Sequence, residues 1–128
     1  ILASDMKDKK LAYDLFERAV RIDAGENMKS SDAGIHAASI AGIWQSVVYG
    51  FGGVRMLHGE LRVCPMLPDA WSSLEFTICW QGQKLAVAST HDQLHIKNMT
   101  GTKTVEIEVY GEKYQISDEI TVNFAEND

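Results

Sequence analysis

The chain has 128 residues, of which 45% are hydrophobic and 23% are charged, a composition typical of a globular rather than a disordered protein. Twelve basic and eighteen acidic residues give a formal net charge of −6. Because no basic stripe is present, this balance argues against nucleic acid as a partner. The length suffices for one domain or for two small layers that share a core.

The first predicted element is an amphipathic helix near the start of the chain. Ser4 or Asp5 can cap its beginning, and Gly25 stands where a left-handed terminator is expected. Its apolar stripe has the spacing of one helix face and comprises Leu11, Leu15, Ala19 and Ile22. Charged residues occupy the opposite side, so one face of this helix is expected to be buried.

A second helix is predicted to begin after Ser31 or Asp32 and to end at a glycine cluster formed by Gly50, Gly52 and Gly53. Gly34 and His36 stand at its start. Backbone amides in the first helical turn lack intrahelical acceptors, and the helix dipole is positive there, so the place suits an anion. The imidazole of His36 can add a donor. We therefore expect a phosphate or similar polar ligand here, held by one part of a larger site.

Residues 33–54 carry no Asp, Glu, Lys or Arg, which raises the question of a membrane span. The segment nevertheless contains His36, Gln45, two serines and five glycines, so a helix buried on all sides within a protein, and no membrane partner, is the better interpretation. Two helices cannot bury that much apolar surface. The chain also begins at Ile1, and we expect it to be the C-terminal part of a longer protein whose other helices lie upstream.

After Gly53 the hydrophobic period changes from 3.6 to 2, which indicates a switch from helix to sheet. Turns are predicted at His58–Gly59, Gln81–Gly82 and Gly111–Glu112. Eight strands are expected, at residues 54–57, 60–64, 74–80, 83–89, 94–98, 104–110, 113–116 and 120–124. The fold class is therefore α+β, with a helical segment at 1–53 and an antiparallel β-sandwich domain at 54–128.

Cysteine and histidine spacing predicts no metal site. Cys64 and Cys79 belong to no C-x-x-C pattern, and His58, His91 and His95 have no ligand spacing between them. Free, buried thiols in a reducing compartment, hence a cytoplasmic location, are the default expectation. A disulfide between the two cysteines stays open as an alternative.

The aromatic residues are interpreted first as packing groups: Trp44 and Tyr49 in the core of the second helix, and Trp71 and Trp80 in the β domain. Arg55 and Arg62 flank a hairpin and are expected to pair with surface acids. A different function class would be a non-catalytic carbohydrate-binding or docking module. It would need an exposed aromatic platform made from Trp71, Trp80, Tyr110 and Tyr114.

Four motifs in order carry a family resemblance: 32–38 (DAGIHAA), Ala41-Gly42-x-Trp44, 50–55 (GFGGVR) and Leu67-Pro68-x-x-Trp71. Together they resemble the C-terminal part of the maltose, trehalose and kojibiose phosphorylases of glycoside hydrolase family 65. The strand pair 76–85 (FTICWQGQKL) is similar to a hairpin of the same family. The resemblance covers nearly the whole chain.

The resemblance implies an (α/α)6 barrel whose last two helices, followed by a β-sandwich, form this chain. The implied reaction is phosphorolysis of an α-glucosyl disaccharide with inversion, giving β-glucose 1-phosphate. His36 would correspond to the phosphate-contacting histidine, and Gly34 would let the backbone approach the anion. A serine loop and the general-acid glutamate would lie upstream, so no catalytic residue is expected in this chain and no activity from it alone.

The same resemblance implies a disaccharide and inorganic phosphate as ligands, no further cofactor, and the upstream barrel as the main partner. A homodimer is compatible with the sequence, which does not determine the oligomeric state. A relative such as an acid trehalase, in which water replaces phosphate, is the alternative within the family; the upstream serine loop would distinguish the two.

Overall fold

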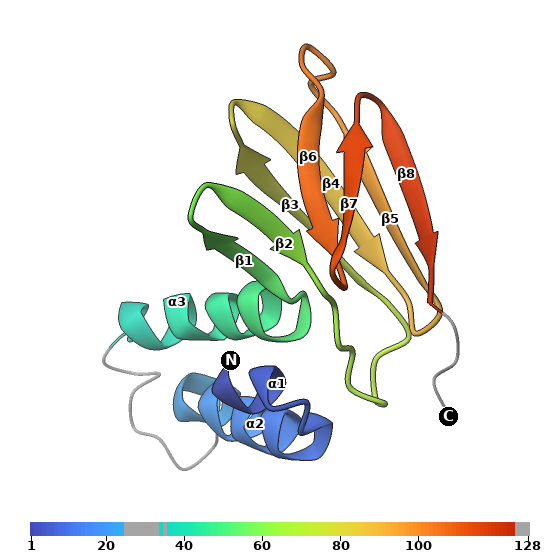
Figure 1. Ribbon diagram of the computed structural model, residues 1–128. Coiled ribbons are helices and arrows are strands. Elements are labelled where there is room, and N and C mark those ends of the chain that lie inside the picture. The colour runs from blue at the N-terminus through green and yellow to red at the C-terminus, as the bar shows by residue number, and fades with distance from the viewer. Residues whose placement is uncertain (25–33, 35, 125–128) are drawn as a thin grey trace.

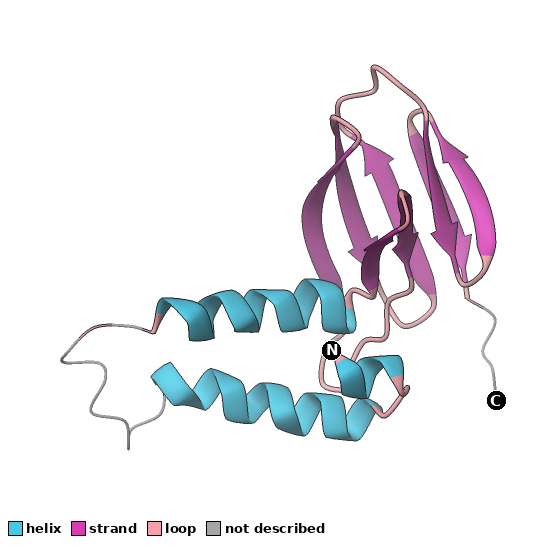
Figure 2. Ribbon diagram, turned by 60° about the vertical axis from the view of Figure 1, so that its left-hand side comes forward, coloured by secondary structure: helices cyan, strands magenta, loops and turns pink. Residues whose placement is uncertain are grey.

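The computed structural model describes residues 1–24, 34 and 36–124. They form two layers, a small helical layer and a β-sandwich that stands on it (Figure 1). The helical layer contains α1 (Leu2–Asp5), α2 (Lys9–Ala24), α3 (Ala37–Gln45) and η1 (Ser46–Phe51), a stretch of π-helix that continues α3. Figures 1 and 2 show α2 and α3 side by side, with the far end of α3 directed away from the sandwich.

The first helical segment is broken where the sequence predicted one continuous helix. Lys7 has a positive φ of 59°, which ends α1. Asp8 then begins α2, because its carboxylate accepts a hydrogen bond from the Leu11 amide at 2.9 Å and its carbonyl accepts one from Ala12. The expected caps Ser4 and Asp5 are therefore wrong for the long helix, and Asp8 caps it. The expected terminator, Gly25, lies outside the described residues.

The second helix ends as expected and starts at Ala37 in the described part of the chain, with His36 as its N-cap. The candidate caps Ser31 and Asp32 lie outside the described residues. At the other end, Gly53 has a φ of +63°, and a Cβ there would lie 1.9 Å from the Cys64 carbonyl oxygen. Only glycine fits this turn, which directs the chain from the helical layer into the first strand.

The sandwich consists of two four-stranded sheets, with strand orders β1-β2-β6-β7 and β3-β4-β5-β8. Five of the strand pairings are antiparallel, and β2 pairs with β6 in parallel through Arg62 and Glu108. The fold class is therefore as predicted apart from this one parallel pairing. The strands are β1 (Val54–Leu57), β2 (Glu60–Val63), β3 (Leu74–Trp80), β4 (Gln83–Ser89), β5 (Gln93–Asn98), β6 (Val105–Val109), β7 (Glu112–Ile116) and β8 (Glu119–Asn123).

Three hairpins close with two-residue turns in which both residues have positive φ, the requirement of a type I′ turn. They are His58–Gly59, Gln81–Gly82 and Tyr110–Gly111. The first two were predicted. The third lies one residue earlier than expected, because Glu112 already belongs to β7.

The described residues form two apolar cores. The larger one lies between the two sheets and is built from inward-facing strand residues such as Val63, Leu85 and Ile107, together with Val48 of η1. The second core lies between the helical layer and the sandwich. It contains Ala3, Ala12, Phe51, Leu67 and Leu74, with Tyr13, Phe16, Val47, Trp71 and Phe76 packed against them. This second core, hereafter the joint core, holds the two layers together.

The second helix lacks the cover expected from helices upstream, and one of the two thiols expected to be buried is exposed. No residue of α3 is buried, so the helix is not covered on all sides, and Trp44 is 51% exposed, in contact with Tyr49. Cys79 is exposed because it points outward from β3, whereas Cys64 is partly buried, and both are free thiols. No helix in the described part of the chain is long and apolar enough to cross a membrane.

Candidate functional site

Gly34 and His36 lie together at the start of α3, as the sequence predicted. The carbonyl oxygen of His36 accepts hydrogen bonds from Ser39 at 2.9 Å and Ile40 at 3.1 Å, so the residue caps the helix through its backbone. His36 has an extended backbone, with φ −85° and ψ 95°, and both it and Gly34 are exposed. This end of α3 is the one farthest from the sandwich (Figures 1 and 2).

The start of α3 has the electrostatics of an anion site. No acidic residue stands in its first turn. The backbone carbonyl of His36 accepts hydrogen bonds from the amides of Ser39 and Ile40. The amides of Ala37 and Ala38 come before these two, so no carbonyl within α3 is placed to accept from them. Gly34 has a φ of +118°, and nothing in the described structure lies within 4 Å of the place where a Cβ would stand. A ligand can therefore approach this backbone without a steric barrier from the described residues.

The helical layer also presents apolar side chains to solvent. Ile40 and Trp44 on α3 are exposed, and so are Leu11, Leu15 and Ile22 on α2. Three of the four residues of the predicted α2 stripe therefore face outward, while the neighbouring Ala12 and Phe16 enter the joint core. Several large apolar side chains exposed on neighbouring helices are typical of a surface that contacts another part of a protein.

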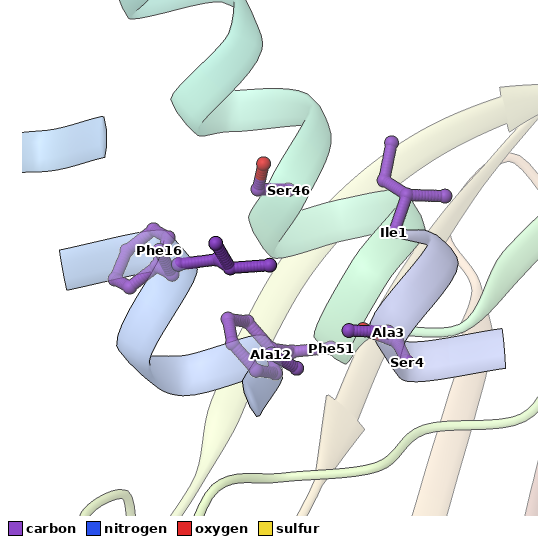
Figure 3. Close-up of a pocket in the computed structure, with 8 residues that line it drawn as sticks. Ile1, Ala3, Ser4, Ala12, Phe16, Ser46 and Phe51 are labelled. Carbon is purple, nitrogen blue, oxygen red and sulfur yellow. The ribbon is translucent and has the colours of Figure 1, made fainter. Parts of the chain in front are cut away.

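A small pocket lies between α1, α2 and η1 (Figure 3). It has a volume of about 70 Å³ and is lined by Ile1, Ala3, Ser4, Ala12, Leu15, Phe16, Ser46 and Phe51. The Ser46 hydroxyl donates to the Gly42 carbonyl at 2.8 Å. A pocket this small cannot hold a sugar, for which cavities of roughly 300 Å³ or more are usual. It is a gap in helix packing.

A second hollow of about 300 Å³ on the sandwich is bordered by the acidic residues Glu60, Glu106 and Glu108. These carboxylates are paired: Lys113 binds Glu60 and Glu106, and Arg62 binds Glu108 at 3.2 Å. The hydrogen bond from Lys113 lowers the pKa of Glu60 below its usual value. A general acid requires a raised pKa, so Glu60 is not a proton donor for catalysis.

The histidines of the sandwich serve structural contacts. The His91 Nε2 atom lies 2.7 Å from the Trp71 carbonyl oxygen, and His95 Nδ1 lies 3.1 Å from the Thr121 hydroxyl. Within residues 1–24, 34 and 36–124, no group of three His, Cys, Asp or Glu side chains is arranged to hold a metal ion.

The four aromatic residues that could have formed a sugar platform do not share a face. Trp71 packs edge-on against Phe51, with ring centroids 4.9 Å apart, and Trp80 and Tyr114 pack against the sandwich core. Tyr110 is exposed, but its hydroxyl donates to the Pro65 carbonyl. The structure therefore does not support a carbohydrate-binding module built on these side chains.

Arg55 has a larger role than the sequence indicated. A surface ion pair was expected, and Arg55 does bind the Asp5 carboxylate. The same guanidinium also donates to the carbonyl oxygens of Tyr49 and Val54, so it connects three elements. Only its position two residues after Gly53 could have indicated this role. Where the chain turns at a glycine cluster, backbone carbonyl groups are left that need hydrogen-bond donors.

Two family models match this chain. Residues 1–45 match the central catalytic domain of glycosyl hydrolase family 65, and residues 54–116 match the C-terminal domain of the same family. His36 and the start of α3 thus fall in the part that matches the catalytic domain.

Relatives and a solved structure agree with this result. A kojibiose phosphorylase from Halothermothrix orenii is 38% identical over 121 residues, which cover 91% of this chain and 16% of the relative. An alpha,alpha-trehalose phosphorylase from Geobacillus stearothermophilus is 29% identical over 127 residues, 96% of this chain and 16% of the relative.

A solved structure from the human microbiome, assigned as a kojibiose phosphorylase, superimposes with a TM-score of 0.89 at 31% identity and covers 98% of this chain and 18% of that one. The chain therefore spans less than a fifth of the length of these relatives. Both family models and these relatives agree with the four motifs found in the sequence: the chain belongs to glycoside hydrolase family 65.

Proposed function

We propose that this chain is the C-terminal part of an inverting disaccharide phosphorylase and that His36 and Gly34 contribute part of its phosphate site. The observation that carries the proposal is the position of these residues. They stand at an exposed helix start, with no acidic residue in the first turn of α3, within the segment that matches the family's catalytic domain. The relatives named above are phosphorylases of kojibiose and trehalose, which supports phosphate as a ligand.

The reaction places a specific demand on this site. An inverting hydrolase needs a base to activate water, whereas phosphate is already an anionic nucleophile. A phosphate oxygen forms a bond to the anomeric carbon as the glycosidic C–O bond breaks, and a carboxylic acid outside this chain gives its proton to the leaving oxygen. The remaining task is to hold phosphate in line with the breaking bond. Helix amides and the His36 imidazole supply hydrogen-bond donors for that task.

The exposed apolar surface of the helical layer is the proposed contact with the rest of the polypeptide. Helices of an (α/α)6 barrel packed on Leu11, Leu15 and Trp44 would bury side chains that are exposed in this chain. This arrangement makes 1–53 the end of the barrel and 54–128 a separate sandwich domain. The chain alone is then inactive, because the general acid and the other phosphate ligands lie elsewhere. The two free thiols fit a cytoplasmic enzyme.

The test is His36→Ala in the full-length enzyme, with steady-state kinetics at varied phosphate and varied disaccharide. Loss of one charge-assisted donor is expected to raise the KM for phosphate about tenfold or more, since such a bond contributes about 1.5–3 kcal/mol. The KM for the disaccharide should change much less. His95→Ala, a half-exposed histidine on the sandwich, is the matched control. Equal rises in both constants would contradict the proposal.

A further inference from the structure

One arginine side chain makes several of the contacts at the end of α3 that meets the sandwich. The guanidinium of Arg55 on β1 donates to the Tyr49 carbonyl in η1, to the Val54 carbonyl at 2.8 Å, and to the Asp5 carboxylate in α1. The side chain is 25% exposed, so these bonds are partly shielded from water. One residue thus joins the helical layer to the first strand.

Backbone and aromatic contacts strengthen the same junction. The Met66 amide donates to the Phe51 carbonyl at 2.8 Å, and the Cys64 amide donates to the Gly53 carbonyl at 3.2 Å. Phe51 is 2% exposed and meets both Phe16 and Trp71 edge-on. The last turn of the helix is therefore held by the sandwich and by the segment after β2 on several sides.

The opposite end of the same helix carries His36. Helix α3 and η1 run without interruption from Ala37 to Phe51, which corresponds to about 20 Å at the usual helical rise. A tilt of only about 3° at the fixed end would therefore move the other end by about 1 Å. Misplacement of this size can cost a reaction about a hundredfold in rate when it affects a group that holds a reactant.

We propose that Arg55 is a positioning residue for phosphate, and that the β-sandwich serves as the rigid base that sets the tilt of α3. The inference rests on the proposed function, because it acts through His36. It gives the sandwich a role in catalysis although none of its residues touches a substrate. Loosening the Arg55 contacts should therefore weaken the use of phosphate at a site about 20 Å away.

Arg62 offers a matched control. It lies on β2 directly opposite Arg55 in the strand register. Its ion pairs with Glu60 and Glu108 stay within the sandwich and do not reach the helical layer. A variant at Arg62 removes the same side chain from the same hairpin without releasing α3.

The experiment compares Arg55→Gln and Arg62→Gln in the full-length enzyme, with kcat and both KM values measured on each. We expect Arg55→Gln to raise the KM for phosphate about tenfold, with the KM for the disaccharide within about twofold of wild type. Arg62→Gln should leave both constants near wild type. If Arg55→Gln does not yield folded enzyme, Arg55→Lys, which keeps the charge facing Asp5 but loses the planar fork, is measured with the same criteria.

Two results would overturn the proposal. One is an equal effect of the Arg55 and Arg62 variants on the KM for phosphate. The other is a parallel change of both KM values in the Arg55 variant, as general destabilisation would produce. His36→Ala separates the two levels of inference: if it shifts the KM for phosphate and Arg55→Gln does not, only the positioning role fails. If His36→Ala has no phosphate-specific effect, the proposed function fails, whatever the Arg55 variants do.

Discussion

The β-sandwich and the helical layer differ in where their apolar residues point. In the sandwich, alternate residues of both sheets face each other, and strand residues such as Leu94 and Ile96 are fully buried. In the helical layer, the buried residues face the sandwich through the joint core, while Leu15, Ile40 and Trp44 face solvent. The core between the two sheets is closed within this chain. The helices are buried only on the side that packs against the sandwich.

This difference shows for which part of the chain the stability can be explained from residues 1–128 alone. Stability of the sandwich is decided by contacts within residues 54–124, together with Val48 and Tyr49 of η1, which pack into or against its core. Stability of α2 and α3 depends on the joint core within this chain, and on the proposed barrel contacts beyond it. Substitutions at the junction, on the open helix face and within each layer should therefore have effects of very different size.

The largest effect is expected at the turn between the two regions. Gly53→Ala places a Cβ 1.9 Å from the Cys64 carbonyl oxygen at a φ of +63°, so the chain must move where both layers meet. We expect a loss of more than about 4 kcal/mol in the free energy of unfolding, measured in urea by circular dichroism. Gly111→Ala is the control. Its φ is +91°, but nothing in the described structure lies within 4 Å of the new Cβ, so only about 1–2 kcal/mol should be lost. Similar losses for both would show that strain, not overlap, decides.

Two tryptophans, Trp71 in the joint core and Trp44 on α3, test the comparison directly. Trp71→Ala removes a ring that packs against Phe16 and Phe51 in the joint core and should cost about 3 kcal/mol in chain 1–128. Trp44→Ala removes a ring that is 51% exposed and touches Tyr49, so it should cost less than about 1 kcal/mol there. In the full-length enzyme, where barrel helices are proposed to cover α3, the cost of Trp44→Ala should rise toward that of Trp71→Ala. Urea unfolding of both proteins gives the four values. A Trp44 cost that is equally small in both would contradict the proposed contact.

A smaller effect is expected at the helix cap that the sequence missed. Asp8→Ala removes the carboxylate that accepts the Leu11 amide, and the loss of such a cap typically costs about 1 kcal/mol. Asp14→Ala, which removes only an exposed ion pair with Lys10, should cost less than about 0.5 kcal/mol. Thermal unfolding followed by helical circular dichroism measures both. A larger loss for Asp14 would show that Asp8 does not hold the start of α2.

The strands were predictable because their information is local. Alternation in Leu74, Phe76, Ile78 and Trp80 indicates the inward face of β3, and the paired turn residues mark two of the three hairpins at their correct positions. The helix break at Lys7 was not predicted, because the apolar stripe begins only at Leu11 and residues 7–10 are all charged, so no apolar period marks the chain there. The parallel pairing of β2 with β6 joins segments more than forty residues apart, and nothing in either strand specifies the partner.

The candidate site was predictable only in part, for a related reason. Gly34 and His36 are two positions apart in the sequence and carry their own signal, a helix start that can bind an anion. The Arg55 contacts join residues up to fifty positions apart, so the arginine resembles any surface charge until the fold is known. Helical spacing predicts that the face of α3 with Trp44 is buried. It does not say whether the covering residues belong to this chain, so the exposure of Trp44 could not be predicted.

The smallest effect concerns Tyr110, which ties the turn between β6 and β7 to the segment that follows β2. Although the residue as a whole is exposed, its hydroxyl is partly buried where it donates to the Pro65 carbonyl, and this burial raises its pKa to about 12 from an ordinary value of 10.0. The folded state therefore holds this proton more tightly than the unfolded state does. Its contribution to stability is complete below pH 10.0 and is lost as the pH rises toward about 12.

Tyr110→Phe should cost about 1 kcal/mol near neutral pH, through the lost hydrogen bond, and should reduce the decline in stability above pH 10.0. Urea midpoints across this alkaline range measure both. An unchanged alkaline decline in the stability of the variant would assign the titration to another group. Because the Tyr110–Pro65 contact lies wholly within the sandwich, the result should be the same in chain 1–128 and in the full-length enzyme, unlike the result for Trp44→Ala.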